Sequence, residues 1–165
     1  MTATPPNPEI LLEQSDLIHD EQTVQAAIDG LAGKITADFG NSNPLVMCVM
    51  GGAVVFAGQL LPKLQFPLIF DYVHASRYHD QTHGQQHLVW KVTPDDKVRG
   101  RIVILLDDIL DEGHTLAAVK QKCLEQGAAK VVIVVLADKL LGHAKPIMAD
   151  YVGLQVPNRY VFGCG

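Results

Sequence analysis

Residues 101–116, RIVILLDDILDEGHTL, decide how the rest of the chain is organised. Residues 102–106 form a continuous apolar run rich in β-branched side chains, which is typical of a strand buried on both faces of a parallel sheet. The run ends at Asp107 and Asp108, and from Leu116 onward the apolar residues recur with helical spacing. We therefore predict a strand, an acidic loop and a helix in that order.

The loop between this strand and helix combines two kinds of ligand-binding group. Gly113 permits a positive φ and a close approach of the backbone, and the N–H groups that open the helix can hold a phosphate. Asp107 and Asp108 only accept hydrogen bonds when ionised, so they suit ligand hydroxyls. In open α/β sheets, ligands bind outside the carboxyl ends of the strands. An acidic, solvated strand end is the alternative, but the combination favours a sugar-phosphate site.

The loop also resembles the phosphoribosyl-diphosphate signature of type I phosphoribosyltransferases. That signature has an apolar strand, two acidic residues, two apolar residues and then Asp-Thr-Gly-x-Thr. The last part reads Asp111-Glu112-Gly113-His114-Thr115 in this chain, so Glu112 stands where the family usually has Thr or Ser. The resemblance implies that these five residues hold the 5-phosphate. Because a carboxylate would repel phosphate, we expect the Glu112 side chain to point to solvent.

The same resemblance implies roles for the carboxylates. Asp107 and Asp108 would bind the ribose hydroxyls and the associated Mg²⁺ ion. Asp111 would be the catalytic residue, facing N7 of a purine and handling its proton.

A second strand followed by a glycine loop lies earlier in the chain. Residues 45–49 are apolar, and Met50-Gly51-Gly52 follow at once. These residues resemble the diphosphate-binding loop of hypoxanthine-guanine phosphoribosyltransferases, which often has Lys at the position of Met50. The resemblance implies that Met50, Gly51 and Gly52 bind diphosphate and that a cis peptide lies near Val49–Met50. Taken alone, two glycines could equally form a tight turn.

The C-terminal third contains the candidates for base binding. Residues 130–136 read as another buried strand, with Lys139 just past its end, and residues 149–165 resemble the family's base-binding hood. By this resemblance Lys139 binds the 6-oxo group of a purine, Tyr160 stacks on the ring and Val161 lies beside it. A solvated lysine and an ordinary core tyrosine are the alternatives.

A polar segment separates two further predicted strands. Residues 68–75 and 87–91 read as strands, and Ser76, Arg77 and Tyr78 lead into the polar run between them. In the resembled family a flexible loop with a Ser-Tyr pair closes over the reacting centre. We therefore expect these three residues to belong to a mobile loop.

Composition limits the class of protein. The 165 residues are 48% hydrophobic with a formal net charge of −5, which indicates one globular domain and argues against general nucleic-acid binding. No apolar stretch approaches the ~20 residues that span a bilayer, and no signal peptide is evident. The cysteines lack metal spacing and read as reduced thiols of a cytoplasmic protein. Residues 1–8 are Pro-rich, and we expect them to be disordered.

Together these features predict an α/β fold: an open, mostly parallel twisted sheet flanked by helices, of the type I phosphoribosyltransferase kind, with a small base-binding hood. The resemblance implies transfer of phosphoribosyl from phosphoribosyl diphosphate to hypoxanthine or guanine, giving IMP or GMP, with Mg²⁺ as cofactor and a homodimer or homotetramer as the assembly. A xanthine-preferring enzyme and a non-catalytic nucleotide sensor remain open. The resemblance stops at Gly165, where the family continues to a further Asp. The printed sequence is therefore either a shortened chain or one that ends early.

Overall fold

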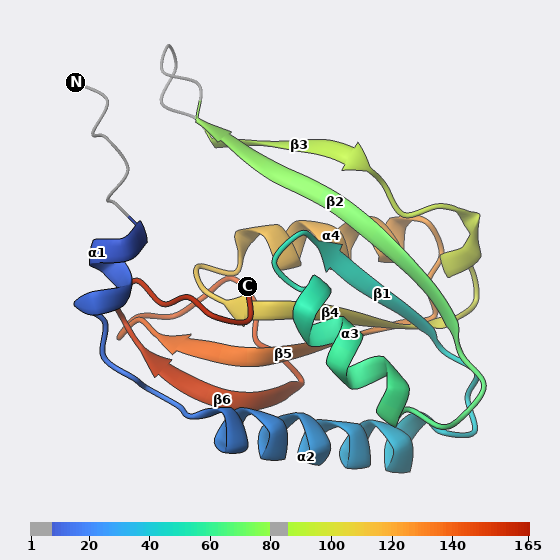
Figure 1. Ribbon diagram of the computed structural model, residues 1–165. Coiled ribbons are helices and arrows are strands. Elements are labelled where there is room, and N and C mark those ends of the chain that lie inside the picture. The colour runs from blue at the N-terminus through green and yellow to red at the C-terminus, as the bar shows by residue number, and fades with distance from the viewer. Residues whose placement is uncertain (1–7, 80–85) are drawn as a thin grey trace.

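A six-stranded sheet with the strand order β3-β2-β1-β4-β5-β6 forms the centre of the structure (Figure 1), a computed structural model that describes residues 8–79 and 86–165. Neighbouring strands are parallel except β2 and β3, which are antiparallel. The predicted open, mostly parallel sheet is therefore confirmed. Its strands are β1 (Leu45–Met50), β2 (Ile69–His79), β3 (Gln86–Val92), β4 (Ile102–Leu110), β5 (Lys130–Leu140) and β6 (Tyr151–Pro157).

Helices cover both faces of the sheet. The α-helices are α1 (Pro8–Glu13), α2 (Glu21–Phe39), α3 (Val54–Leu60) and α4 (His114–Glu125), and two short 3₁₀ turns, η1 and η2, span Leu61–Lys63 and Asp96–Val98. The Asp20 carboxylate caps α2 by accepting the Thr23 N–H at 2.8 Å. Helix α1 was not predicted. Residues 1–7 of the segment expected to be disordered lie outside the described residues.

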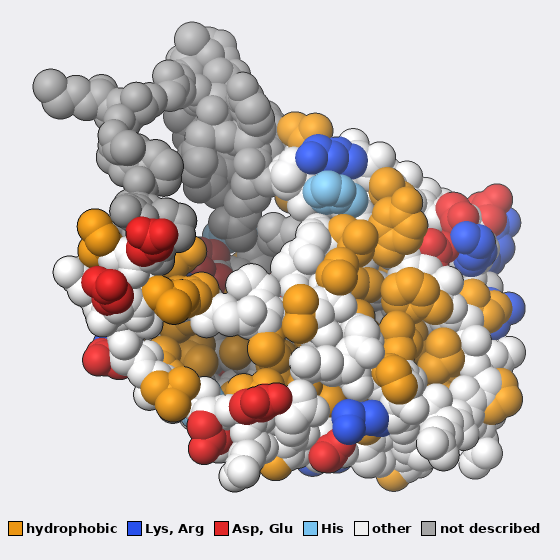
Figure 2. Space-filling model, in the orientation of Figure 1, with side chains coloured by type: hydrophobic (Ala, Val, Ile, Leu, Met, Phe, Trp, Pro, Cys, Tyr) orange, Lys and Arg blue, Asp and Glu red, His pale blue; other side chains and the backbone are white. Residues whose placement is uncertain are grey.

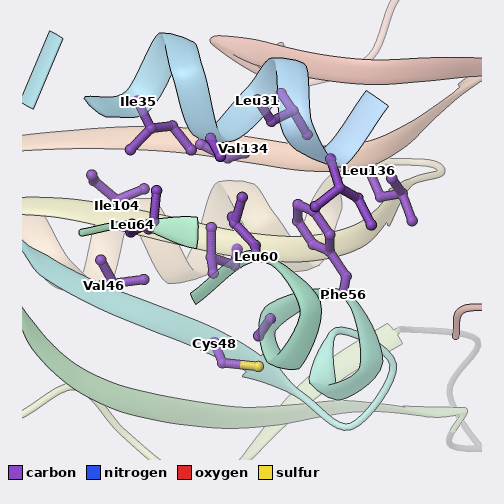
Figure 3. Close-up of a cluster of buried hydrophobic side chains, with 14 of the residues drawn as sticks. Leu31, Ile35, Val46, Cys48, Phe56, Leu60, Leu64, Ile104, Val134 and Leu136 are labelled. Carbon is purple, nitrogen blue, oxygen red and sulfur yellow. The ribbon is translucent and has the colours of Figure 1, made fainter. Parts of the chain in front are cut away.

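The apolar strands separate two cores. Alternate residues of β1, β4 and β5 point to opposite faces of the sheet, so both faces of these strands are buried, as the continuous apolar runs predict. Helices α2 and α3 pack on one face, where Figure 3 shows Leu31 and Ile35 of α2 and Phe56 and Leu60 of α3 over Ile104 and Val134. Helix α4 packs on the other face through Leu116, Val119 and Cys123.

Strand β4 extends further than predicted. The apolar run stops at Leu106, but the strand continues through the acidic pair to Leu110. Strand β1 accompanies β4 only as far as the pair Cys48 and Leu106, whereas β5 remains paired to the last residue of β4. The acidic residues therefore lie on a strand with backbone partners on one side only, rather than in a loop.

Two other strands also run past their predicted ends. Strand β2 reaches His79, so Ser76, Arg77 and Tyr78 lie within it, and their backbones pair with β3. The prediction that these three residues belong to a loop is therefore wrong, because β3 pairs with them and extends the strand. Residues 80–85 of the predicted loop lie outside the described residues. Strand β5 likewise includes Lys139, which was expected just past its end.

The C-terminal part completes the sheet and then returns across it. Strand β6 joins the sheet as an edge strand beside β5, and residues 158–165 carry no helix or strand. In Figure 1 this last segment runs back toward the carboxyl ends of β4 and β1. Within the described residues, no helix is long and apolar enough to cross a bilayer.

Candidate functional site

A cavity of about 200 Å³ lies at the carboxyl ends of β1 and β4. The chain moves outward from β1 to β2 on one side and later fills the other side with β4, so this is the point where the strand order reverses. Open α/β sheets bind ligands at such a switch point because the loops on either side diverge there. The cavity is lined by Val49, Met50, Gly52, Asp107, Ile109, Leu110, Asp111, Glu112, Gly113, Thr115 and Leu116.

Asp107 of the acidic pair lines this cavity, and Asp108 follows it on β4. The Asp107 carboxylate accepts the backbone N–H of Asp108 at 3.1 Å. Burial and the neighbouring Asp108 charge raise the pKa of Asp107 well above its usual range. Within residues 8–79 and 86–165, neither carboxylate forms an ion pair with a lysine or arginine. The site therefore presents two carboxylates whose charge a ligand or cation would relieve.

The glycine loop after β1 lies directly against Asp108. A Cβ atom on Gly52 would come 2.5 Å from Oδ2 of Asp108, so only glycine fits there without a shift of the carboxylate. The peptide bond between Met50 and Gly51 is cis, one bond further along than expected. The structure thus brings the two segments that were singled out separately, 50–52 and 107–108, into contact. Gly165 of the C-terminal segment also lies against Asp108.

The turn into α4 forms the opposite wall. Gly113 has φ +82°, which side chains disfavour, and it directly precedes α4. The first turn of a helix offers backbone N–H groups without partners inside the helix, together with the positive end of the helix dipole. A Cβ atom at Gly113 would meet Cγ2 of Ile147 at 3.0 Å, so the segment between β5 and β6 packs closely over this turn.

Two side chains of this wall are already paired. Nζ of Lys139 lies 2.8 Å from Oδ2 of Asp111, and the lysine side chain is only 12% exposed. The Glu112 carboxylate lies 3.5 Å from Nε2 of His143 and is 46% exposed. Glu112 therefore has a partner on the next segment rather than pointing only to solvent, although it still borders the cavity.

The other predicted base-binding residues lie in the segment that follows β6. Tyr160 is 76% exposed and its ring centre is 6.1 Å from that of Phe162, so it is not a core tyrosine. Tyr160 and Val161 belong to the irregular segment after β6, within the predicted base-binding hood. Neither residue lines the cavity.

One group at the site escaped the sequence analysis. Lys145, in the connection between β5 and β6, has a side chain that is only 10% exposed. Its ammonium donates to the Leu110 carbonyl at 2.7 Å and to the Asp138 carboxylate at 2.6 Å. No sequence signal distinguishes this lysine from a solvated one in a polar connection. Only its position beneath the end of β4 reveals it.

Considered as chemistry, the arrangement offers backbone N–H groups for a phosphate, carboxylates for hydroxyls or a hard cation, and a Lys–Asp pair for a polar heterocycle. All three kinds of group lie at the carboxyl ends of the strands.

Comparison with known proteins identifies relatives of the chain. The model of the phosphoribosyl transferase domain matches residues 14–165. A hypoxanthine-guanine phosphoribosyltransferase of Lactococcus lactis is 32% identical over 149 residues, which cover 90% of this chain and 80% of that protein.

Solved structures agree with these relatives. A hypoxanthine-guanine phosphoribosyltransferase of Bacillus anthracis superposes with a TM-score of 0.78 at 27% identity, covering 92% of this chain and 88% of the other. A mutant hypoxanthine phosphoribosyltransferase of Trypanosoma cruzi, solved as a ternary complex with its substrates, gives a TM-score of 0.72 at 27% identity over 87% of this chain and 82% of the other.

Proposed function

Since this chain belongs to the hypoxanthine-guanine phosphoribosyltransferase family, we propose that it transfers the 5-phosphoribosyl group from phosphoribosyl diphosphate to hypoxanthine or guanine. The products are IMP or GMP and diphosphate, which makes the chain an enzyme of purine salvage. The comparisons favour this activity over the xanthine-preferring enzyme and the nucleotide sensor that the sequence left open.

The observation that carries the proposal is the Lys139–Asp111 pair. Asp111 is the first of residues 111–115, the turn that opens α4 and that we call the phosphate turn. On a 6-oxopurine, O6 and N7 lie on one edge of the ring. An ammonium donates to O6, and a carboxylate beside it faces N7 and handles its proton. The 2.8 Å contact gives the two protein groups the close spacing that this edge requires. Tyr160, whose side chain is exposed, is assigned to stacking on the base, with Val161 next to it.

The sugar and its phosphates are assigned to the groups around the cavity. Residues 111–115 hold the 5-phosphate through the N–H groups that open α4. Met50, Gly51 and Gly52 hold the diphosphate through their backbone, because Gly52 offers no side chain and lies against Asp108. Asp107 and Asp108 accept hydrogen bonds from the ribose hydroxyls and, as fixed negative charges, favour the positive charge that develops on the ribose ring.

Mg²⁺ fits the acidic pair by the chemistry of its donors. Mg²⁺ prefers oxygen ligands and is commonly held by one or two carboxylates together with water and substrate phosphates. Asp107 and Asp108 would hold it, and the raised pKa of Asp107 indicates a carboxyl whose ionised form lacks a cationic partner among the described residues. When bound, the ion offsets the negative charge of the departing diphosphate.

The assembly that we propose is a homodimer or homotetramer formed through an apolar face of β2 and α3. Figure 2 shows hydrophobic side chains gathered over these two elements. Phe70 and Tyr72 of β2 are 49% and 43% exposed, and Val54 and Val55 of α3 are 46% and 45% exposed. A contiguous exposed apolar patch of this kind marks an interaction surface. Light scattering on the purified chain, with and without Tyr72→Glu, tests this assembly.

We also propose that residues 1–165 form a single domain that works in the cytoplasm. The cysteines Cys48, Cys123 and Cys164 are all free, which fits a reducing compartment. Burial raises the pKa of the Cys48 and Cys123 thiols to about 11, so both are held as unreactive neutral thiols.

The activity is tested by mixing the protein with Mg²⁺, phosphoribosyl diphosphate and hypoxanthine, and following IMP formation. Asp111→Asn serves as the matched variant, because it keeps the shape of the side chain and removes its proton-accepting charge. General acid–base help contributes roughly 10²–10⁴-fold, so kcat should fall by that order while binding of phosphoribosyl diphosphate persists. Wild-type turnover in the variant would remove Asp111 from the mechanism.

A further inference from the structure

A buried ammonium joins the ends of β4 and β5. Lys145 lies in the connection between β5 and β6, and its Nζ atom is within 2.7 Å of the Leu110 carbonyl and 2.6 Å of the Asp138 carboxylate. Leu110 and Asp138 are themselves partners in the β4–β5 register, at the last pair that the two strands form. Lys145 therefore bridges β4 and β5 at the last residues that pair them.

The residues that Lys145 holds are the immediate neighbours of the proposed base-binding pair. Leu110 precedes Asp111, and Asp138 precedes Lys139. Two ion pairs thus lie on neighbouring residues, Lys139 with Asp111 at 2.8 Å and Lys145 with Asp138 at 2.6 Å. Both lysine side chains are nearly buried, at 12% and 10% exposure, while the Asp111 side chain remains 49% exposed toward the cavity.

The same connection supports the phosphate turn. Pro146 and Ile147, which directly follow Lys145, lie within 3.7 and 3.0 Å of a Cβ built on Gly113. The segment is consequently fixed at one end by the lysine contacts and packed on the turn at the other. A buried charge is costly unless its hydrogen bonds are made, so the lysine holds its two acceptors in a defined geometry.

The Lys145 ammonium already donates to two protein acceptors, the Leu110 carbonyl and the Asp138 carboxylate, so we assign it to holding these groups rather than to contacting a substrate. We propose that Lys145 is a positioning residue for the phosphoribosyl transfer, fixing the Leu110 carbonyl and Asp138 so that Asp111 and Lys139 meet the purine edge in register. This inference rests on the proposed function. A misplacement of about 1 Å from the reacting geometry can cost on the order of 10²-fold in rate.

The test compares Lys145→Met with Lys145→Arg in the full chain. Methionine keeps the apolar stem and removes both hydrogen bonds, so kcat for IMP formation should fall about tenfold or more and the KM for hypoxanthine should rise. The dissociation constant of phosphoribosyl diphosphate with Mg²⁺, measured by calorimetry, should stay near the wild-type value. Arginine keeps the charge and the donors and should recover a large part of the lost activity.

A matched control is available at the other end of the sheet. Lys97 also contacts two carboxylates, Asp71 at 2.6 Å and Asp95 at 3.3 Å, but far along the strands from the cavity. Lys97→Met should leave the transfer kinetics unchanged. Should Lys145→Met fail to fold, Asp138→Asn is measured instead, because it weakens one acceptor of the same lysine. It should lower kcat and raise the KM for hypoxanthine by smaller factors, again without a change in the affinity for phosphoribosyl diphosphate.

The outcomes separate the inference from the activity on which it rests. A wild-type chain that forms no IMP would contradict the proposed function. An active wild type whose Lys145→Met (or, failing that, Asp138→Asn) variant keeps wild-type kcat and hypoxanthine KM would overturn the positioning role. The positioning role would also be overturned if the variant's affinity for phosphoribosyl diphosphate and its melting temperature fell together with its activity. That pattern indicates a lysine whose role is purely structural.

Discussion

Lys139 and Asp111 meet across the carboxyl ends of β5 and β4 at 2.8 Å, with the lysine nearly buried and the aspartate half-exposed to the cavity. The pair places a hydrogen-bond donor and an acceptor side by side above the turn that opens α4. The two residues are 28 positions apart in the sequence, so only the fold brings them together. The pairing of these two residues is therefore a property of the tertiary fold.

Removing the Lys139 ammonium should impair the use of the purine base but not the binding of phosphoribosyl diphosphate. Lys139→Ala is expected to lower kcat/KM for hypoxanthine by roughly 10–10²-fold, since a hydrogen bond from a charged group to O6 is lost. Binding of phosphoribosyl diphosphate, which involves other residues, should be spared. Steady-state kinetics and calorimetric titration measure the two effects, and equal losses in both would argue against the assignment.

The close approach of Gly52 to Asp108 makes residues 50–52, the proposed diphosphate-binding loop, intolerant of a side chain at position 52. In Gly52→Ala the added Cβ would lie 2.5 Å from the Asp108 carboxylate, so the loop or the carboxylate must move. We expect phosphoribosyl diphosphate to bind roughly tenfold more weakly. Gly58→Ala in α3 is the control, because a Cβ there meets nothing within 4 Å and helical alanine is favoured over glycine. Unchanged affinity in Gly52→Ala would contradict the close packing.

Asp107 should make the protein less stable as the pH rises. Its pKa is raised well above the ordinary 3.8 by burial and by Asp108, so the folded chain retains a proton that the unfolded chain releases. Stability is then greatest below the ordinary pKa and declines as the pH rises through the folded pKa.

Asp107→Asn removes this decline. In EDTA and without substrate, its melting temperature should exceed that of the wild type at about pH 8, and the difference should close toward about pH 4. Thermal melts across this range provide the measurement, and a difference that is independent of pH would show that Asp107 does not titrate in this way. The same variant should lose activity.

Glu112 introduces a negative charge at the phosphate turn, partly balanced only when His143 is protonated. Glu112→Thr should strengthen phosphoribosyl diphosphate binding by up to about fivefold, which corresponds to about 1 kcal/mol for an exposed charge pair. The gain should shrink at high salt, because screening weakens repulsion between exposed charges. Titration at two ionic strengths tests this, and weaker binding by the variant would mean that Glu112 supports the turn.

The sequence predicted the buried parallel strand and the helix that follows it because both depend on local patterns. The apolar run 102–106 and the helical spacing from Leu116 are read directly from neighbouring residues. The extension of β4 through Asp107 and Asp108 could not be read in this way. It depends on β5 continuing to offer backbone partners after β1 has diverged.

The residues that sequence reasoning misplaced or missed share this dependence on distant partners. Ser76, Arg77 and Tyr78 are polar, yet β3 pairs with them and holds them in β2. Lys145 looks like a solvated lysine until the fold places Leu110 and Asp138 beside it. Tertiary pairing therefore determines where polar side chains near the ends of strands lie. The hydrophobic periodicity of the sequence is enough to place the apolar core.

Base discrimination by the wild-type chain tests the central claim most directly. The protein is incubated with Mg²⁺, phosphoribosyl diphosphate and either hypoxanthine, guanine or adenine, and nucleotide formation is followed. Lys139 offers donors only, and adenine presents an amino donor at the position of O6, so the two would repel. The account predicts IMP and GMP from the first two bases and no AMP from the third. Efficient formation of AMP, or no nucleotide from hypoxanthine and guanine, would contradict it.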